Sequence, residues 1–124
     1  MSVEKARIVA TYTAAADRYD DGCAAFWGYF GRRTVERLSL PRGARVLDAC
    51  CGTGSAALPA AEIVGPRGFV LGLDLTPALL AKAESKARER GFDHLRSLKI
   101  RRLVNKEQAG RVASADVIAG LARD

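Results

Sequence analysis

The sequence has no apolar run of membrane-spanning length, no cluster of cysteine and histidine, and few aromatic residues. A transmembrane helix needs roughly 20 consecutive apolar residues, and the N-terminus, MSVEKARIVA, lacks the apolar stretch of a secretion signal. The three cysteines, Cys23, Cys50 and Cys51, have no CxxC spacing and His94 is the only histidine, so a zinc site is not indicated. These absences favour a cytoplasmic protein that keeps its cysteines reduced.

What is present is an ordinary globular composition with an uneven charge. The 124 residues, 48% of them apolar, suffice for one small domain with its own core. The net charge of +6 comes from the segment Lys82–Arg111, which holds ten of the twenty Lys and Arg but only four of the fourteen Asp and Glu. Such a segment is either a solvated helix face or a surface for nucleic acid. No aromatic residue follows Phe92 to stack on bases, which favours the solvated face.

The stretch Arg45–Gly54, RVLDACCGTG, is the one around which the chain is organised. Its apolar start predicts a short buried strand that ends at Asp48, and the small residues that follow predict a tight loop. Residues 55–64 predict a helix that Pro59 shortens or kinks. A strand, a glycine loop and a helix in this order are typical of a cofactor site, because glycines let a ligand approach the backbone and the N–H groups at the helix start face it.

The rest of the chain predicts alternating helices and strands. Apolar residues recur at helical spacing in the N-terminal region, which carries most of the aromatic residues. These first two helices either pack on the sheet edge or form a lid over a pocket. The order predicts an α/β fold, a Rossmann-like parallel sheet with flanking helices. The predicted helices are 3–19, 26–38, 55–64, 76–91 with Thr76 as N-cap and Gly91 as C-terminal cap, and 104–122, and the predicted strands are 46–48, 69–73 and 95–100.

Asp48 and Asp74 narrow the choice of ligand. Each ends a predicted strand, and neighbouring parallel strands end at the same edge of a sheet, so both carboxylates should face one crevice. Asp74 can accept hydrogen bonds from two ribose hydroxyls. Gly52, Gly54 and Ala57 match G-x-G-x-x-G/A, but a carboxylate four residues before Gly52 would repel a pyrophosphate and attract an ammonium group. A ligand with ribose at one end and an amino acid at the other fits better, and S-adenosylmethionine is such a ligand.

From about Tyr19 to Phe92 the chain resembles the class I S-adenosylmethionine-dependent methyltransferases, especially the ubiquinone and menaquinone biosynthesis methylase-like branch. The resemblance rests on VLDACCGTG, VGPRG, FVLGLDLTPALL and KARERGF. It implies methyl transfer to a small-molecule acceptor, such as a quinone-type precursor. The cofactor-binding residues that it implies are Asp48, Cys50, Gly52, Thr53 and Gly54 in the loop, Asp74 at the ribose, Leu75 near adenine, and Tyr19, with Tyr12, in an N-terminal cover.

The chain also departs from the resembled family. Cys50 stands where members commonly have glycine, and KIRRLV supplies no acid where members have one after the third strand. The fourth strand and the final three strands are missing or unrecognisable after about residue 96, although Asp116 to Ile118 resemble the start of the fourth. We therefore expect a half-sheet that is truncated or divergent. The predicted division is a helical cover at 1–43, an S-adenosylmethionine-binding half at 44–100 and a basic divergent tail at 101–124.

Two functions of different class stay open on these residues. The first is an S-adenosylmethionine-binding methyltransferase, or its cofactor-binding fragment. The second is a non-catalytic basic module that binds nucleic acid or a protein partner through Lys82–Arg111. A dehydrogenase ranks third, because the glycine pattern alone also permits it. We assign no catalytic base and no metal ligand: His94 lies before the third predicted strand, opposite the crevice. The edges of a half-sheet predict self-association.

Overall fold

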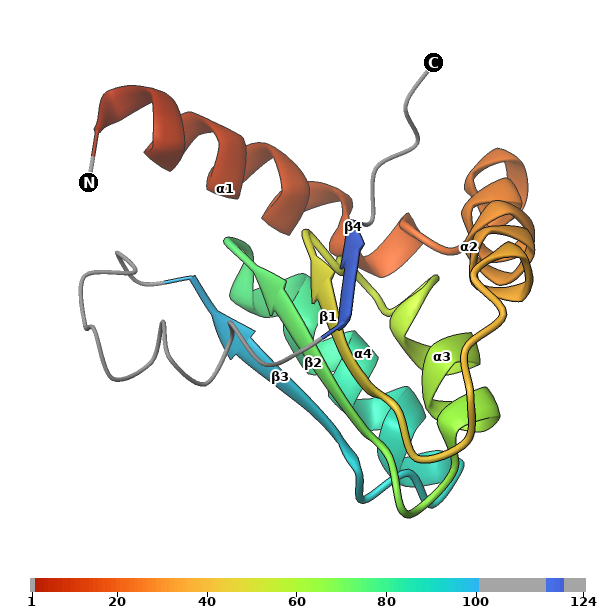
Figure 1. The fold of residues 1–124 in the computed structure, drawn as a ribbon. Coiled ribbons are helices and arrows are strands. Elements are labelled where there is room, and N and C mark those ends of the chain that lie inside the picture. Colours follow the sequence, from red (N-terminus) through yellow and green to blue (C-terminus); the bar gives the residue numbers. More distant parts are fainter. Residues whose placement is uncertain (1, 101–115, 120–124) are drawn as a thin grey trace.

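The computed structural model describes residues 2–100 and 116–119 of the chain. Its centre is a parallel sheet with the strand order β3-β2-β1-β4 (Figure 1). This arrangement confirms the predicted Rossmann-like parallel sheet with flanking helices. The elements are α1 (Val3–Ala15), the 3₁₀ helices η1 (Ala16–Arg18) and η2 (Gly22–Ala25), α2 (Phe26–Arg37), β1 (Arg45–Ala49), α3 (Ala57–Val64), β2 (Phe69–Asp74), α4 (Pro77–Glu89), β3 (Leu95–Lys99) and β4 (Asp116–Ala119).

β4 corrects two predictions. It pairs in parallel with β1, with Val46 opposite Asp116, while β1 pairs on its other side with β2. The fourth strand is therefore present, and the helix predicted over 104–122 is wrong at 116–119; the remainder of that range lies outside the described residues. The segment DVIA is too short to show a strand period. Its structure depends on pairing with a strand far away in the sequence, which no local pattern reveals.

The helix α4 begins and ends where the sequence predicts. Pro77 occupies the first turn, where no N–H is needed, and Gly91 follows the helix with a φ of 69°. The N–H of Phe92 donates to the carbonyl of Ala87 at 2.8 Å and so satisfies the last turn. Thr76 is the N-cap residue, but its side chain makes no capping hydrogen bond. The start of α4 therefore depends on the proline rather than on the threonine hydroxyl.

The helix α3 is shorter than predicted. It begins at Ala57, two residues later than the sequence suggests. Pro59 therefore lies in the first turn, where its missing N–H removes no hydrogen bond within the helix. The two preceding residues belong to the glycine loop (residues 50–56), which is thus longer than the sequence predicts.

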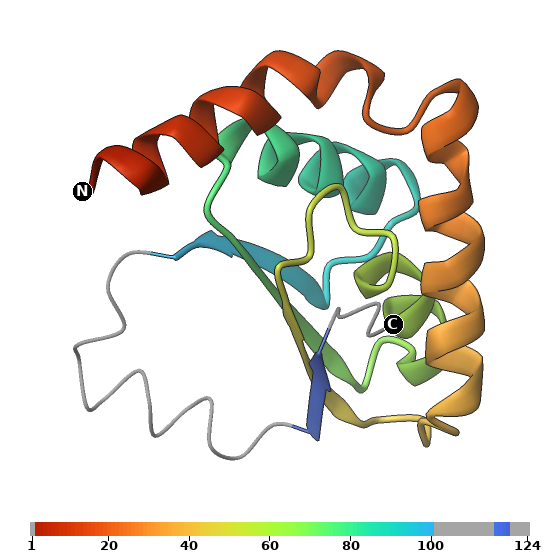
Figure 2. The ribbon, with the colours of Figure 1, turned by 90° about the horizontal axis from the view of Figure 1, so that it is seen from above.

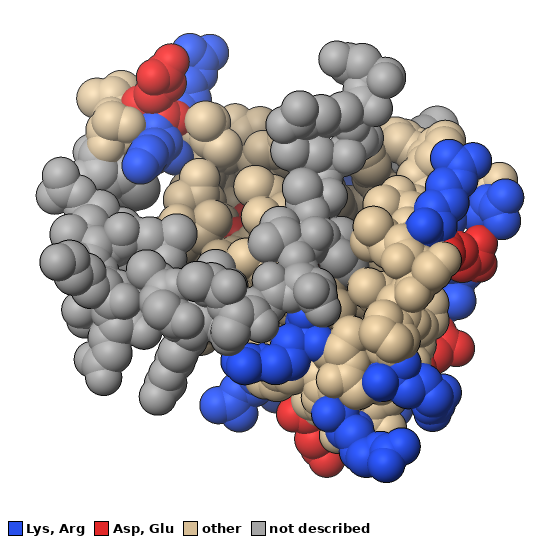
Figure 3. Space-filling view, viewed as in Figure 1, with Lys and Arg blue, Asp and Glu red and all other residues tan. Residues whose placement is uncertain are grey.

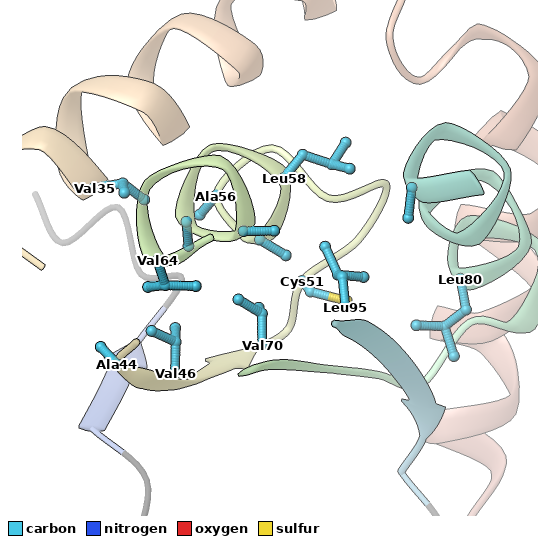
Figure 4. Close-up of a cluster of buried hydrophobic side chains, with 14 residues drawn as sticks. Val35, Ala44, Val46, Cys51, Ala56, Leu58, Val64, Val70, Leu80 and Leu95 are labelled. Carbon is cyan, nitrogen blue, oxygen red and sulfur yellow. The ribbon is translucent and has the colours of Figure 1, made fainter. Parts of the chain in front are cut away.

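The apolar core lies between the sheet and the helices α3 and α4 (Figure 4). Val46 of β1 and Val70 of β2 point into it and are at most 1% exposed. Gly72 of β2 makes room for the buried Cys51, because a side chain at position 72 would place its Cβ only 2.7 Å from Cys51 Sγ. The larger members of the core come from both helices and three strands: Val46, Leu58, Val64, Val70, Leu80 and Leu95.

The described part of the N-terminal cover (residues 2–43) packs on helices rather than on the sheet. The helix α1 buries none of its residues and lies beside α4, at the edge where the strands end (Figures 1 and 2). The helix α2 packs on α3 through Val35 and through Gly31, where any Cβ would overlap the carbonyl oxygen of Ser55. The prediction that the two helices pack on the sheet edge is therefore wrong, because they pack on α4 and α3 instead. The aromatic residues of α2 are exposed: Phe26, Trp27, Tyr29 and Phe30.

Candidate cofactor site

The carboxyl ends of β1 and β2 bring Asp48 and Asp74 into one neighbourhood, as the sequence predicts. Asp48 is the fourth residue of β1 and Asp74 is the last of β2, in a register that pairs Ala49 with Leu73. The order of the strands changes direction at β1, since β2 and β3 follow on one side and β4 lies on the other. Open α/β sheets bind their ligands at this point, outside the carboxyl ends of the strands.

Asp48 is a buried carboxylate without a partner. It is 1% exposed, and neither of its oxygens has a hydrogen-bond partner of good geometry among the described residues. Burial raises the pKa of Asp48 to about 7, the charge of Asp74 adds to the rise, and the backbone N–H of Ala57 opposes it. A buried carboxyl group of this kind takes up a proton near neutral pH unless an opposite charge lies beside it. A cationic group at this position would favour the charged carboxylate.

Asp74 is held in place by two backbone N–H groups. Its Oδ2 accepts a hydrogen bond from Gly52 at 3.0 Å, and its Oδ1 accepts one from Thr76 at 2.8 Å. These bonds fix the carboxylate and tie the glycine loop to the end of β2. Each oxygen keeps a lone pair for another donor. Leu75 follows directly and is half-buried.

The glycine loop contains three left-handed backbone positions, at Cys50, Gly52 and Gly54, with φ of 63°, 53° and 92°. Glycine adopts this conformation freely, whereas any L side chain is strained in it. Cys50 therefore stands at a position that favours glycine. Burial raises the pKa of its thiol, as do the charges of Asp74 and Asp48, so Cys50 is a neutral thiol at the exposed surface of the loop.

The hydroxyl of Thr53 is directed to the N-terminal cover. It donates to Asp20 Oδ1 at 2.6 Å, and the Thr53 side chain is fully buried. Lys86 of α4 lies 2.6 Å from Asp20 Oδ2 and donates to the carbonyl of Thr53 at 3.2 Å. Burial alone would raise the pKa of Asp20, but the hydrogen bonds from Lys86 and Thr53 lower it below its ordinary value. Sequence reasoning missed Asp20 and Lys86, because no local pattern joins residues so far apart.

Tyr19 brings the cover to the glycine loop. A Cβ at Gly52 would lie 3.9 Å from Tyr19 Cε1, and the Tyr19 ring lies 6.1 Å from that of Tyr12. Burial raises the pKa of Tyr19, with smaller contributions from Tyr12, Asp74 and Asp20. The structure thus places Tyr19 next to the crevice, and Tyr12 behind it on α1 with an exposed fraction of 43%.

Comparison with known proteins agrees with this geometry. The family model described as Methyltransferase domain matches residues 40–119, a range that includes all four strands. The chain belongs to this methyltransferase family. The match extends past residue 96 to residue 119, so it covers most of the segment that the sequence alone left unrecognised.

Two curated methyltransferases illustrate the likeness. Demethylmenaquinone methyltransferase of Anoxybacillus flavithermus is 36% identical over 93 residues, which are 72% of this chain and 39% of that protein. Aklanonic acid methyltransferase DauC of Streptomyces sp. is 35% identical over 91 residues, 73% of this chain and 41% of that protein. The chain spans about two fifths of the length of these relatives.

A solved structure supports the fold. The S-adenosylmethionine-dependent methyltransferase from Aquifex aeolicus superimposes with a TM-score of 0.59 and 21% identity, over 72% of this chain and 47% of that one. At this level of identity the likeness shows the fold alone.

S-adenosylmethionine, the cofactor of this class of methyltransferases, fits the residues present. Its ammonium and sulfonium charges suit the unpartnered carboxylate of Asp48, and its ribose hydroxyls suit the free lone pairs of Asp74. Between these two residues, the loop carries glycine at two of its three left-handed positions, Gly52 and Gly54, so that no side chain projects from the backbone there. Within the described residues no group of three metal-binding side chains occurs.

Other residues singled out in the sequence lie away from the crevice. His94 Nε2 lies 2.8 Å from the carbonyl oxygen of Ala61, just before β3, so it donates that hydrogen bond to α3 as a structural contact. In the basic segment, Lys82 pairs with Asp17 at 3.5 Å. Figure 3 shows basic side chains on one face of the molecule in separate places, several of them beside acids. Residues 101–111 of the segment lie outside the described part, and none of the helices described is long and apolar enough to cross a membrane.

A cavity of about 320 Å³ lies between α2, α3, α4 and the end of the glycine loop. Asp48 and Asp74 are not among its lining residues, but Gly54 of the glycine loop is. Its walls carry several charged side chains from the cover and from α4. The lining residues are Asp20, Ala25, Gly28, Arg32, Gly54, Ser55, Leu58, Pro59, Lys86 and Arg90.

Proposed function

We propose that this chain binds S-adenosylmethionine at the carboxyl ends of β1 and β2 and serves methyl transfer to a small-molecule acceptor. The observation that carries the proposal is the Asp48 carboxylate, which is 1% exposed and has no partner among the described residues. Burying an unpaired charge lowers the stability of a fold, so the charge at this position is best explained by a cationic ligand. Membership of the methyltransferase family supplies the matching ligand.

The proposed roles follow the contacts around the crevice. Asp48 meets the ammonium of the methionyl part, and Asp74 accepts from the ribose hydroxyls, since its two backbone bonds already hold it in position. Leu75 packs near the adenine, and Tyr19 covers the ligand from the N-terminal side. The loop residues proposed to surround the methionyl part are Cys50, Gly52, Thr53 and Gly54. Thr53 would contribute through its backbone, because its hydroxyl is bound to Asp20.

The chemistry needs alignment more than it needs reactive side chains. S-adenosylmethionine supplies an electrophilic methyl group, and transfer is an in-line displacement in which the protein aligns the acceptor. The relatives are named for demethylmenaquinone and for aklanonic acid. We therefore propose a quinone-type or related aromatic acceptor, with the N-terminal cover as one wall of its pocket. We propose no catalytic base.

The division of the chain remains a proposal as well: the cover at 1–43, the cofactor-binding half at 44–100 and the basic segment at 101–124. β4 falls within the last of these and extends the sheet beside β1. Its outer edge and that of β3 have no neighbouring strand among the described residues. Self-association through such an edge is a proposal that the concentration dependence of sedimentation tests. The cytoplasm remains the proposed location.

Calorimetric titration with S-adenosylhomocysteine at pH 8 tests the proposed cofactor. Wild type should bind saturably, and Asp48→Asn should weaken binding by roughly tenfold or more, because it removes the charge that meets the ammonium. The exposed Asp93→Asn is the matched control and should bind like wild type. Asp48→Asn also relieves a buried charge and is expected to stabilise the ligand-free protein, so weaker binding cannot come from unfolding.

The same titration separates the other functions. An absence of heat with S-adenosylhomocysteine, together with saturable binding of NADH, would replace the proposal with a dehydrogenase. Salt-sensitive binding to DNA of random sequence without cofactor heat would support the basic module. Equal affinity of wild type and Asp48→Asn would refute the role of Asp48.

A further inference from the structure

We propose that Asp20 is a positioning residue, which holds the glycine loop in its ligand-binding place through Thr53 and Lys86. The three side chains are called the Asp20 latch here. The inference rests on the proposed function, because it concerns the loop that would surround the cofactor. The inference goes beyond the proposed function, because it assigns a role to Asp20 and Lys86, which lie outside the crevice.

The latch is a closed set of three polar contacts. Asp20 accepts from the Thr53 hydroxyl at 2.6 Å through one oxygen and lies 2.6 Å from Lys86 Nζ through the other. Lys86 in turn donates to the Thr53 carbonyl at 3.2 Å. Each member thus contacts both others. The three come from the segment after η1, from the glycine loop and from α4, so the latch joins the cover, the loop and the helix layer.

Apolar side chains support the loop on one side only. A Cβ at Gly54 would lie 3.0 Å from Leu58 and 3.5 Å from Ala83, whereas Gly54 and Ser55 also form part of the wall of the cavity of about 320 Å³, together with Asp20 and Lys86. Apolar packing therefore does not cover the part of the loop that lines the cavity. The buried Thr53 is held by the latch instead, and Lys86 and Asp20 are each only about one third exposed, which limits their screening by water.

The position of Thr53 makes the latch relevant to the crevice. It lies between Gly52, whose N–H donates to Asp74, and Gly54, whose N–H donates to the carbonyl of Cys51. Tyr19, next to Asp20 in the chain, lies over Gly52. Loss of the Asp20 contacts is therefore expected to free the glycine loop and Tyr19 together, although no latch side chain needs to touch the ligand.

Variants of the latch test this role by titration with S-adenosylhomocysteine. Thr53→Val removes the hydroxyl at nearly constant volume and Lys86→Gln removes the charge; each should raise the Kd about tenfold. Thr53→Ser keeps the hydroxyl and should restore affinity to within about threefold of wild type. Lys82→Gln is the matched control, because it deletes the same charge one turn earlier on α4 and breaks the pair with Asp17, while it acts on Asp20 only through its charge and not through a hydrogen bond. It should leave the Kd unchanged within about twofold.

Hydrogen exchange of the ligand-free protein supplies a readout that needs no cofactor. The amides of Gly52 and Gly54 should exchange about tenfold faster in Thr53→Val and Lys86→Gln than in wild type or Lys82→Gln, while amides of β2 stay unchanged. Faster exchange with an unaltered Kd would overturn the positioning role, and unchanged exchange would overturn the latch itself. A wild type that shows no binding at all would refute the proposed function, whereas the exchange rates would still decide whether the latch holds the loop.

Discussion

The N-terminal cover and the layer formed by the sheet with α3 and α4 are held together by different forces. Among the described side chains of the cover, only Ala16 and Val35 are buried apolar groups, and Tyr29 and Phe30 of α2 are more than half exposed. In the layer, apolar side chains from strands and helices are fully buried, with Val70 at 0%. The layer is therefore held by apolar burial, whereas the cover contributes Val35 to the core cluster, approaches the layer closely at Gly31, and makes its remaining side-chain contacts through ion pairs and hydrogen bonds.

This difference predicts that the cover and the layer respond differently to salt. Apolar burial involves no charges that salt can screen, whereas ion pairs at a protein surface weaken as ionic strength rises. The pairs Asp17–Lys82 and Arg32–Glu62, together with the Asp20 latch, all join the cover to α3, α4 or the glycine loop. The cover should thus loosen under conditions that leave the layer folded. Four experiments test the comparison, in order of decreasing effect.

Asp48→Asn tests the one place where the layer buries a charge. Because the pKa of Asp48 is raised from 3.8 to about 7, the folded protein keeps a proton between these values that the unfolded chain has released. Stability therefore falls as the pH rises from about 4 to about 7. At pH 8.5 the free energy of unfolding of Asp48→Asn should exceed that of wild type by up to about 4 kcal/mol. At pH 4 the two free energies of unfolding should be almost equal. Urea denaturation at both pH values measures this; an equal gain at both would exclude charge as the cause.

Val70→Ala and Val35→Ala compare one buried valine from each region. Val70 lies at the centre of the sheet core, and its truncation should lower the free energy of unfolding by about 2–3 kcal/mol. Val35 is the only buried residue of α2, so its truncation should loosen that helix more than it destabilises the layer. Urea unfolding is followed by far-ultraviolet circular dichroism and by the fluorescence of Trp27 on α2. The two signals distinguish unfolding of the layer from unfolding of the cover. Coincident transitions in both variants would mean that cover and layer unfold as one unit.

Gly31→Ala should displace α2 and, with it, Val35, the residue by which α2 joins the core cluster. A methyl group at this position would overlap the carbonyl of Ser55, which is backbone and cannot rotate away. The expected cost is about 1–3 kcal/mol. Gly28→Ala is the matched control on the same helix, because a Cβ there meets nothing within 4 Å, and it should be neutral or slightly stabilising. Trp27 fluorescence and thermal unfolding report both effects, and a Gly31→Ala protein as stable as the control would contradict the close packing.

Cys50→Gly should have the smallest effect, and it is a gain. The φ of 63° at Cys50 strains any side chain, so glycine relieves about 1 kcal/mol, offset in part by the greater freedom of the unfolded chain. The net increase in the free energy of unfolding should be up to roughly 1 kcal/mol. Cys50→Ala keeps the strained Cβ and serves as the control. A gain of the same size in the alanine variant would assign the effect to the thiol instead.

The sequence predicts the local part of the fold. β2 and α4 carry their own signals, an apolar run before Asp74 and a proline and a glycine at the two ends of the helix. The parallel order then follows from the alternation of elements. β4 is indicated only by the resemblance of Asp116 to Ile118 to the start of a fourth strand and by no local pattern, because its four residues become a strand only beside β1. The exposure of the α2 aromatic residues could not be predicted either, since helical spacing shows which residues share a face but not whether anything covers it.

The candidate site divides in the same way. Asp48 and Asp74 could be placed together from the sequence, because the ends of adjacent parallel strands must lie at one edge. The direction of Thr53 could not, since its partner Asp20 lies in a different segment and only the folded chain brings them within 2.6 Å. The site roles that the resemblance implies for these residues remain predictions that the titrations decide.

The contact between Gly72 and Cys51 has a consequence for the evolution and engineering of this sequence. With only 2.7 Å between Cys51 Sγ and the place of a Cβ at position 72, a side chain at position 72 requires Cys51 to move or to be replaced by a smaller residue. A substitution at position 72 is therefore expected to be tolerated better after residue 51 has become smaller than before. Libraries that vary the loop should therefore vary positions 51 and 72 together, and natural variants should show the two as a covarying pair.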